Sequence, residues 1–266
     1  MNKPQDATVS AAAVPRASGY SIMGHIFGSH LERIGVFRTV AGAIPQYFII
    51  PALIVIHVTL AVVLYQWLLR PLLGTKRVRW ADHVIVDRHR IREMTWFDKF
   101  NCMFCGYANG LCTMINKELD QAAEMSAPVA MWKRPLLFMV CVAALPAYLF
   151  FEICFIVVYD VLVATALGYH RISMRQAWTV LKEKPYAPVH GFLFRTWLRV
   201  MKSVMLRFSG CLDQIESSWC PLRHFETRAG VVYPDHHKNF FGPDELEKMR
   251  EMLRTVGTVS DRKPLY

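Results

Sequence analysis

One apolar run constrains the fold more than any other feature of this sequence. From Tyr47 to Leu69 the chain is almost continuously apolar over 23 residues. At a rise of about 1.5 Å per residue, a helix of this length can span the hydrocarbon core of a bilayer, which is about 30 Å thick. Of all 266 residues, 53% are hydrophobic, more than soluble domains usually contain. We therefore expect an all-α membrane protein with a transmembrane helix over residues 46–70.

A second apolar run, residues 135–169, is too long for one simple span and short for two. We expect a membrane hairpin that is broken near Pro146 or Glu152, or a re-entrant pair buried against the first helix. Carboxylates at membrane depth are costly, so Glu152 and Asp160 should face protein or water. Together with His57 of the first run, they form a candidate polar site in the membrane.

The distribution of charge predicts which side of the membrane the polar segments occupy. The net charge is +10, and the basic residues flank the apolar runs instead of forming one block. Residues 70–134 contain eleven Lys and Arg against seven Asp and Glu. Such a basic excess beside a span is typical of cytoplasmic segments. We expect a multi-pass membrane protein with residues 71–134 and 170–266 in the cytoplasm, and we do not expect nucleic acid as a partner.

Near the start of the chain, no apolar segment follows Met1, so we expect no cleavable export signal. Residues 1–18 lack periodicity and predict a disordered tail. Residues 19–45 show a weak amphipathic pattern, which fits an interfacial helix or an ordinary packed helix. After Gly110, apolar residues recur at helical spacing and place Glu118 on the outward side.

Residues 189–208 form a stronger amphipathic pattern. Large apolar side chains share one broad face, and Arg195, Arg199 and Lys202 lie together at positions i, i+4 and i+7. A helix of this kind is expected to lie on a surface of anionic lipid, with these three cations toward the headgroups. The predicted partners are therefore membrane lipids, and basic amphipathic segments can also dock a protein partner in a membrane complex.

Four residues in two distant segments predict a metal site. Cys102 and Cys105 form a Cys-x-x-Cys pair that we expect to be a turn, and a Cys-Pro dipeptide at Cys220 is followed by His224. Three thiolates and one imidazole are the ligands of tetrahedral zinc or iron. The chain has seven cysteines, an odd number that does not favour a disulfide framework. We expect one zinc or iron ion, which ties together a small cytoplasmic part.

Other assignments of the cysteines remain open. Cys112 or Cys211 could replace His224 as the fourth ligand. The cysteines could also be buried without an ion, or Cys102 and Cys105 could act as a dithiol redox pair.

The two motifs also carry resemblances. Cys-x-x-Cys-Gly-Tyr at residues 102–107 and Cys-Pro at 220–221 resemble the metal knuckles of rubredoxin, although Arg223 stands where the second knuckle has its other cysteine. The longer pattern Asn-Cys-x-x-Cys-x-Tyr-Ala-Asn-Gly at 101–110, with Trp-Cys-Pro-x-x-His at 219–224, is similar to an uncharacterised bacterial membrane-protein family. This second resemblance implies the same ligand set and a bacterial membrane, and it implies no substrate.

Three functions fit these observations. The first is an integral inner-membrane protein with a structural or redox-active metal site. The second is a membrane-embedded metalloenzyme acting on a lipid-soluble substrate through His57, Glu152 and Asp160. The third is an accessory subunit of a larger membrane complex. The sequence does not decide whether the protein is an enzyme.

Overall fold

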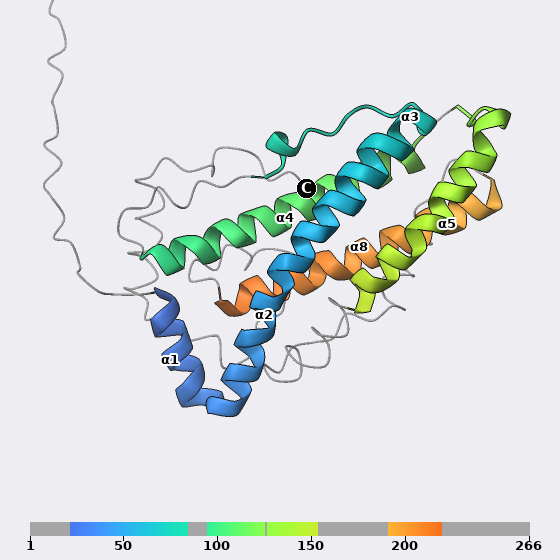
Figure 1. Cartoon of the computed structure of the whole chain (residues 1–266). Coiled ribbons are helices and arrows are strands. Elements are labelled where there is room, and N and C mark those ends of the chain that lie inside the picture. Colours follow the sequence, from blue (N-terminus) through green and yellow to red (C-terminus); the bar gives the residue numbers. More distant parts are fainter. Residues whose placement is uncertain (1–21, 85–94, 126, 154–190, 220–266) are drawn as a thin grey trace, which may run out of the picture.

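A computed structural model describes residues 22–84, 95–125, 127–153 and 191–219 of the chain (Figure 1). This part is helical and, within those ranges, contains no strand. The elements are α1 (Ile22–Ile34), α2 (Val36–Ile56), the π-helix η1 (His57–Leu69), α3 (Arg70–Leu73), the 3-10 turn η2 (Trp80–Asp82), α4 (Trp96–Ala123), the 3-10 turn η4 (Met131–Lys133), α5 (Arg134–Phe151) and α8 (Phe192–Trp219). The predicted tail 1–18, Asp160 and the predicted second metal half-site lie outside the described residues.

The first apolar run forms a longer helix than residues 46–70. Helices α2, η1 and α3 join into one helix of 38 residues, Val36–Leu73, which is about 57 Å long. This helix begins after Gly35, whose positive φ of 82° ends α1 and changes the direction of the chain. Residues 36–45 are also mostly apolar, so the helix extends backward through them and includes Pro45 and Pro51.

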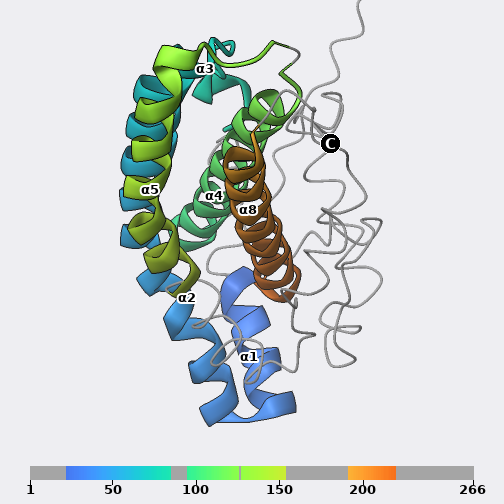
Figure 2. The ribbon, with the colours of Figure 1, turned by 90° about the vertical axis from the view of Figure 1, so that its right-hand side faces the viewer.

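The second apolar run begins with α5, which returns along η1 (Figures 1 and 2). At one end Lys133 Nζ donates to the carbonyl of Pro71 at 3.1 Å. Deeper in the pair, the hydroxyls of Tyr65 and Tyr148 hydrogen-bond in the core. Pro146 lies inside α5, which continues to Phe151, so the chain does not break at this proline. Val36–Leu73 and Met131–Phe151 are both long and apolar enough to cross a membrane.

Helices α4 and α8 form a second layer beside the apolar pair (Figure 2). Helix α4 begins at a capping box, in which the Thr95 hydroxyl accepts from the Asp98 amide and the Asp98 carboxylate accepts from the Thr95 amide. Its side chains reach η1 on one side and α8 on the other. Near its middle, Gly110 lets α4 approach the segment before residue 85, because a Cβ there would lie 2.6 Å from the Cα of Val84.

The prediction that α8 lies on lipid is wrong for its apolar face and for Lys202. The apolar residues of this face are buried in the protein core: Trp197, Leu198, Met201, Val204 and Met205. Lys202 is also buried, and it forms an ion pair with Asp120 of α4 at 2.7 Å. Arg195 and Arg199 are half-buried. Amphipathic periodicity shows that one face is covered, and here protein covers it.

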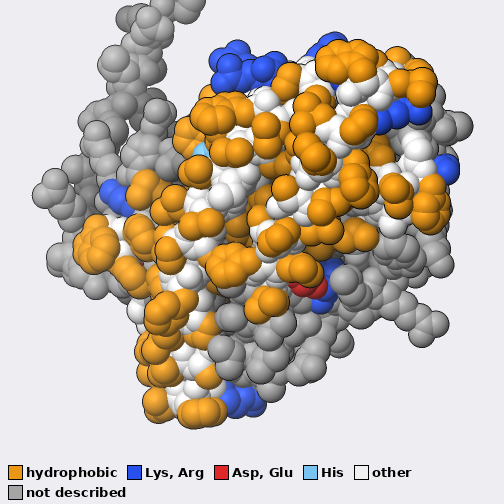
Figure 3. Space-filling model, turned by 45° about the vertical axis from the view of Figure 1, so that its right-hand side comes forward, with side chains coloured by type: hydrophobic (Ala, Val, Ile, Leu, Met, Phe, Trp, Pro, Cys, Tyr) orange, Lys and Arg blue, Asp and Glu red, His pale blue; other side chains and the backbone are white. Residues whose placement is uncertain are grey.

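One surface of the molecule is strongly apolar. Figure 3 shows hydrophobic side chains spread over this face, with Lys and Arg at its margins. The two long apolar helices expose many large hydrophobic side chains: Phe37, Ile44, Phe48, Ile54, Val55, Val58, Trp67, Leu68, Leu136, Phe138, Met139, Val142, Leu145, Leu149 and Phe150. Soluble monomers rarely expose an apolar surface of this extent, so the face is expected to meet lipid or another apolar surface.

Candidate functional site

The first predicted metal half-site lies on a helix and not in a turn. Cys102 and Cys105 are both inside α4, and the helix continues through Gly106. The expected knuckle geometry is therefore wrong for this half. Residues three apart share a helix face, so the two thiols still lie on the same side of α4. Both side chains are half-buried, and Cys102 packs against the hydrophobic core.

The second half-site, Cys220 and His224, lies outside the described residues. Its immediate neighbour, Trp219, is the last residue of α8. Helices α4 and α8 run antiparallel, because Cys112 faces Met205 and Asn116 faces Lys202. The N-terminal part of α4 therefore lies near the C-terminal end of α8.

A cavity of about 410 Å³ lies where the N-terminal part of α4 meets the C-terminal end of α8. Asn101 and Trp219 both line it, and they directly precede Cys102 and Cys220 in the sequence. Helices α1 and α2 contribute the other walls, including Phe27, Ala43 and Tyr47. The structure thus brings together the chain segments that lead into both predicted half-sites.

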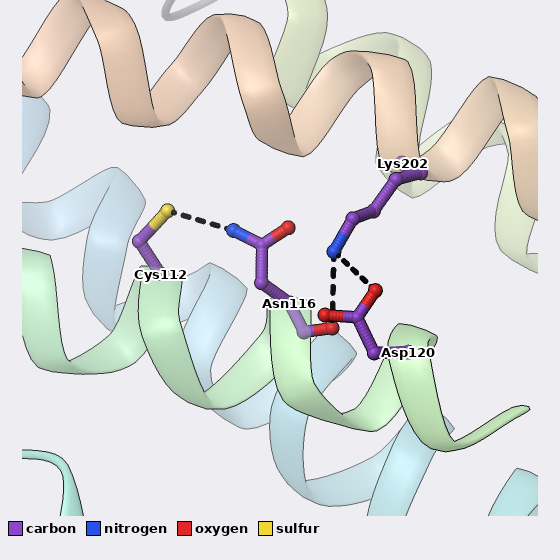
Figure 4. Close-up of polar contacts among 4 residues, drawn as sticks. All are labelled: Cys112, Asn116, Asp120 and Lys202. Carbon is purple, nitrogen blue, oxygen red and sulfur yellow. Dashed lines mark hydrogen bonds and ion pairs between the residues drawn. The ribbon is translucent and has the colours of Figure 1, made fainter. Parts of the chain in front are cut away.

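Polar contacts between α4 and α8 fix the register of the two helices (Figure 4). Lys202 reaches from α8 to Asp120 and to the backbone carbonyl of Asn116, at 2.7 and 3.3 Å. The Asn116 amide donates to the sulfur of Cys112 at 3.5 Å. A buried ammonium needs such acceptors, since an unpaired charge in the core is strongly destabilising.

Cys112 and Cys211, the alternative ligands, are both buried. The sulfur of Cys112 lies 3.9 Å from the Met205 carbonyl oxygen of α8. Within residues 22–84, 95–125, 127–153 and 191–219, no three His, Cys, Asp or Glu side chains are grouped to hold a metal. The predicted set depends on Cys220 and His224, so it stays a prediction.

The predicted membrane polar residues have different partners. His57 of η1 hydrogen-bonds through Nδ1 to the hydroxyl of Tyr107 on α4, at 2.8 Å. Glu152, just after α5, pairs with Arg207 of α8. Asp160 is outside the described residues. His57 and Glu152 each contact a different helix of the second layer, so each acts as a separate link between the layers.

Glu118 is, with Lys202, a polar residue whose placement was predicted wrongly. Its side chain is 4% exposed and faces η1, where it accepts from the side-chain amide of Gln66 and from the Val78 amide. Leu111, Ile115 and Ala122 lie on the same buried face of α4. Their spacing from Glu118 is helical, and this was the signal that could have identified it.

Burial raises the pKa of Glu118 from 4.5 to about 7, against the opposing effects of the Val78 amide, Arg70 and Gln66. An acid whose pKa is raised on folding binds more protons in the folded state, so the free energy of unfolding should fall as pH rises from 4.5 to 7. We expect a fall of about 3 kcal/mol.

Glu118→Gln should abolish most of this pH dependence, because an amide keeps the acceptor oxygen and does not titrate. Thermal unfolding of the detergent-solubilised protein across this pH range measures the effect. The control is Glu124→Gln, at an exposed position that immediately follows α4. If both variants show the same change of unfolding free energy with pH as the parent, Glu118 is not the source of that pH dependence.

Comparison of the chain with protein families, with curated proteins and with solved structures gives no match.

Proposed function

We propose that this chain is an integral inner-membrane protein that binds one zinc or iron ion through Cys102, Cys105, Cys220 and His224. One observation supports this most directly. The residues that precede Cys102 and Cys220, namely Asn101 and Trp219, line one cavity although they are far apart in sequence. A shared ion requires these two segments to be close, and the antiparallel packing of α4 and α8 meets that requirement.

The residues on α4 suit a metal. Two thiols on one helix face can bind the same ion as thiolates, and their partly buried position limits competition from water. A closed four-ligand site of three cysteines and one histidine is typical of structural zinc. Iron in the same site would instead add a one-electron couple. In either case the ion would tie the start of α4 to the chain that follows α8.

The membrane placement follows from the two long apolar helices and their exposed side chains. In our proposal, the outer face of α2, η1 and α5 contacts lipid, and α4 with α8 covers the opposite side. Lys133 precedes α5, Arg134 begins it, and Lys76 and Arg77 follow α3. These cations lie at the same end of the pair, where they would meet anionic headgroups on the cytoplasmic side.

Metal analysis of the purified, detergent-solubilised protein tests the proposal. We expect about one equivalent of zinc without colour, or one of iron with thiolate charge-transfer absorption. Cys102→Ser and Cys220→Ser should each lose the metal and lower the unfolding temperature. Cys141→Ala is the matched control, because Cys141 is a buried cysteine on α5 and is not one of the proposed ligands. A metal-free parent protein, or serine variants as stable and metal-loaded as the parent, would contradict the metal site.

A further inference from the structure

The cavity at the meeting point of α1, α2, α4 and α8 is built from aromatic walls. Its volume of about 410 Å³ lies in the range of small-molecule sites. On one side the rings of Phe27 and Trp219 stack with centroids 6.4 Å apart, and on the other Tyr47 and Phe97 stack at 6.2 Å. Flat aromatic surfaces of this kind suit an apolar ligand, particularly one with a chain or ring that can lie between them.

Most polar side chains of the walls already form hydrogen bonds with another wall side chain or with a nearby backbone carbonyl. The Tyr47 hydroxyl donates to the side-chain oxygen of Asn101, and the Asn101 amide donates to the Phe97 carbonyl. The Gln46 amide donates to the carbonyl of Gly42. The walls therefore offer few donors to a polar or charged ligand.

Trp219 is the exception. Its side chain is only 9% exposed, and no acceptor among the described residues takes the hydrogen of its indole Nε1. A buried donor without an acceptor is unfavourable by about 1 to 3 kcal/mol, so such groups usually have a partner. A ligand oxygen in the adjoining cavity would supply one.

We propose that this cavity binds an apolar molecule from the membrane, whose carbonyl oxygen accepts a hydrogen bond from Trp219 Nε1. The wall residues Phe27, Ile44 and Tyr47 are themselves partly exposed, and Ile44 belongs to the apolar surface of α2 with Phe48. A molecule dissolved in lipid can therefore reach the cavity along an apolar path. Two sources carry this chemistry, the acyl ester of a phospholipid and the ring of a quinone. The inference rests on the proposed membrane placement and does not require the metal.

Native mass spectrometry of the full-length protein, released from detergent after addition of phosphatidylglycerol or of a short-chain quinone, tests this proposal. We expect one molecule of one probe per chain, and the probe that binds identifies the source. Ala43→Phe should abolish binding by filling the cavity. Trp219→Phe keeps an aromatic ring, although a smaller one, and removes the indole N–H donor, so it should weaken binding about tenfold. Val142→Phe, at an exposed position on α5, is the control that should bind like the parent.

Three results would overturn the proposal: a parent that binds neither probe, an Ala43→Phe variant that binds as the parent does, or equal binding by Trp219→Phe and the parent. The conservative Trp219→Phe variant keeps the test decisive if Ala43→Phe fails to fold. Metal content measured on the same samples separates the two proposals. Loaded metal with no bound probe contradicts the cavity alone, and a bound probe without metal contradicts the metal site alone.

Discussion

Arg207→Met is expected to lower the free energy of unfolding by about 3 to 5 kcal/mol, because it leaves Glu152 without its cation in a partly buried position. The side chain of Arg207 is 8% exposed, and its guanidinium donates to Glu152, whose side chain is 19% exposed. The pair joins the end of α5 to α8 and so connects the two layers. Removing one partner of a buried ion pair is far more destabilising than removing both.

A double-mutant cycle separates the lost pair from the lost packing. Glu152→Leu combined with Arg207→Met should recover most of the stability, since no unpaired charge then remains. The measurement is thermal or denaturant unfolding of the detergent-solubilised protein. Arg77→Met, at an exposed position, should change stability by less than about 0.5 kcal/mol. A double variant no more stable than Arg207→Met would show that the charge of Glu152 is not the cause.

Phe208→Ala should be similarly destabilising, by about 3 to 5 kcal/mol, because it opens a cavity where the layers meet. Phe208 of α8 is fully buried, and its ring contacts Phe151 of α5 edge to face with centroids 4.7 Å apart. The variant loses both the buried area and this ring contact. Denaturant unfolding followed by circular dichroism measures the difference.

Helix α8 provides its own control for this prediction. Phe192 is the first residue of the same helix and is 73% exposed, so Phe192→Ala should change stability by at most about 0.5 kcal/mol. The contrast between two identical substitutions tests the orientation of α8. Equal effects at both positions would mean that the apolar face of α8 is not packed as described.

The two long apolar helices could be predicted from the sequence because their composition alone requires a helix of sufficient length. The surface that covers the apolar face of α8 could not be predicted from the sequence. Its periodicity predicts an apolar face, yet lipid and protein satisfy such a face equally well. Only the position of α8 relative to α4 and α5 shows that Lys202 meets Asp120 and not a headgroup. That position depends on contacts between distant segments, which periodicity does not specify.

The candidate site shows a similar limit. A spacing of three residues between Cys102 and Cys105 brings the thiols together in a turn and equally on a helix face, so the local motif does not determine its own conformation. The surrounding apolar positions and the Thr95 capping box extend α4 through the motif. Glu118 could have been placed correctly by following the spacing of Leu111, Ile115 and Ala122, instead of assuming that an acid faces outward.

The antiparallel contact between α4 and α8 also sets an order of events during synthesis. Cys112 and Met205, which face each other, are separated by 93 positions. At about 5 to 20 residues per second, the ribosome needs roughly 5 to 20 seconds to make the chain between them. During that interval α8, which packs on α4 among the described helices, has not yet been completed. Assembly of the second layer is therefore completed late, after the hydrophobic elements that would enter the bilayer have been made.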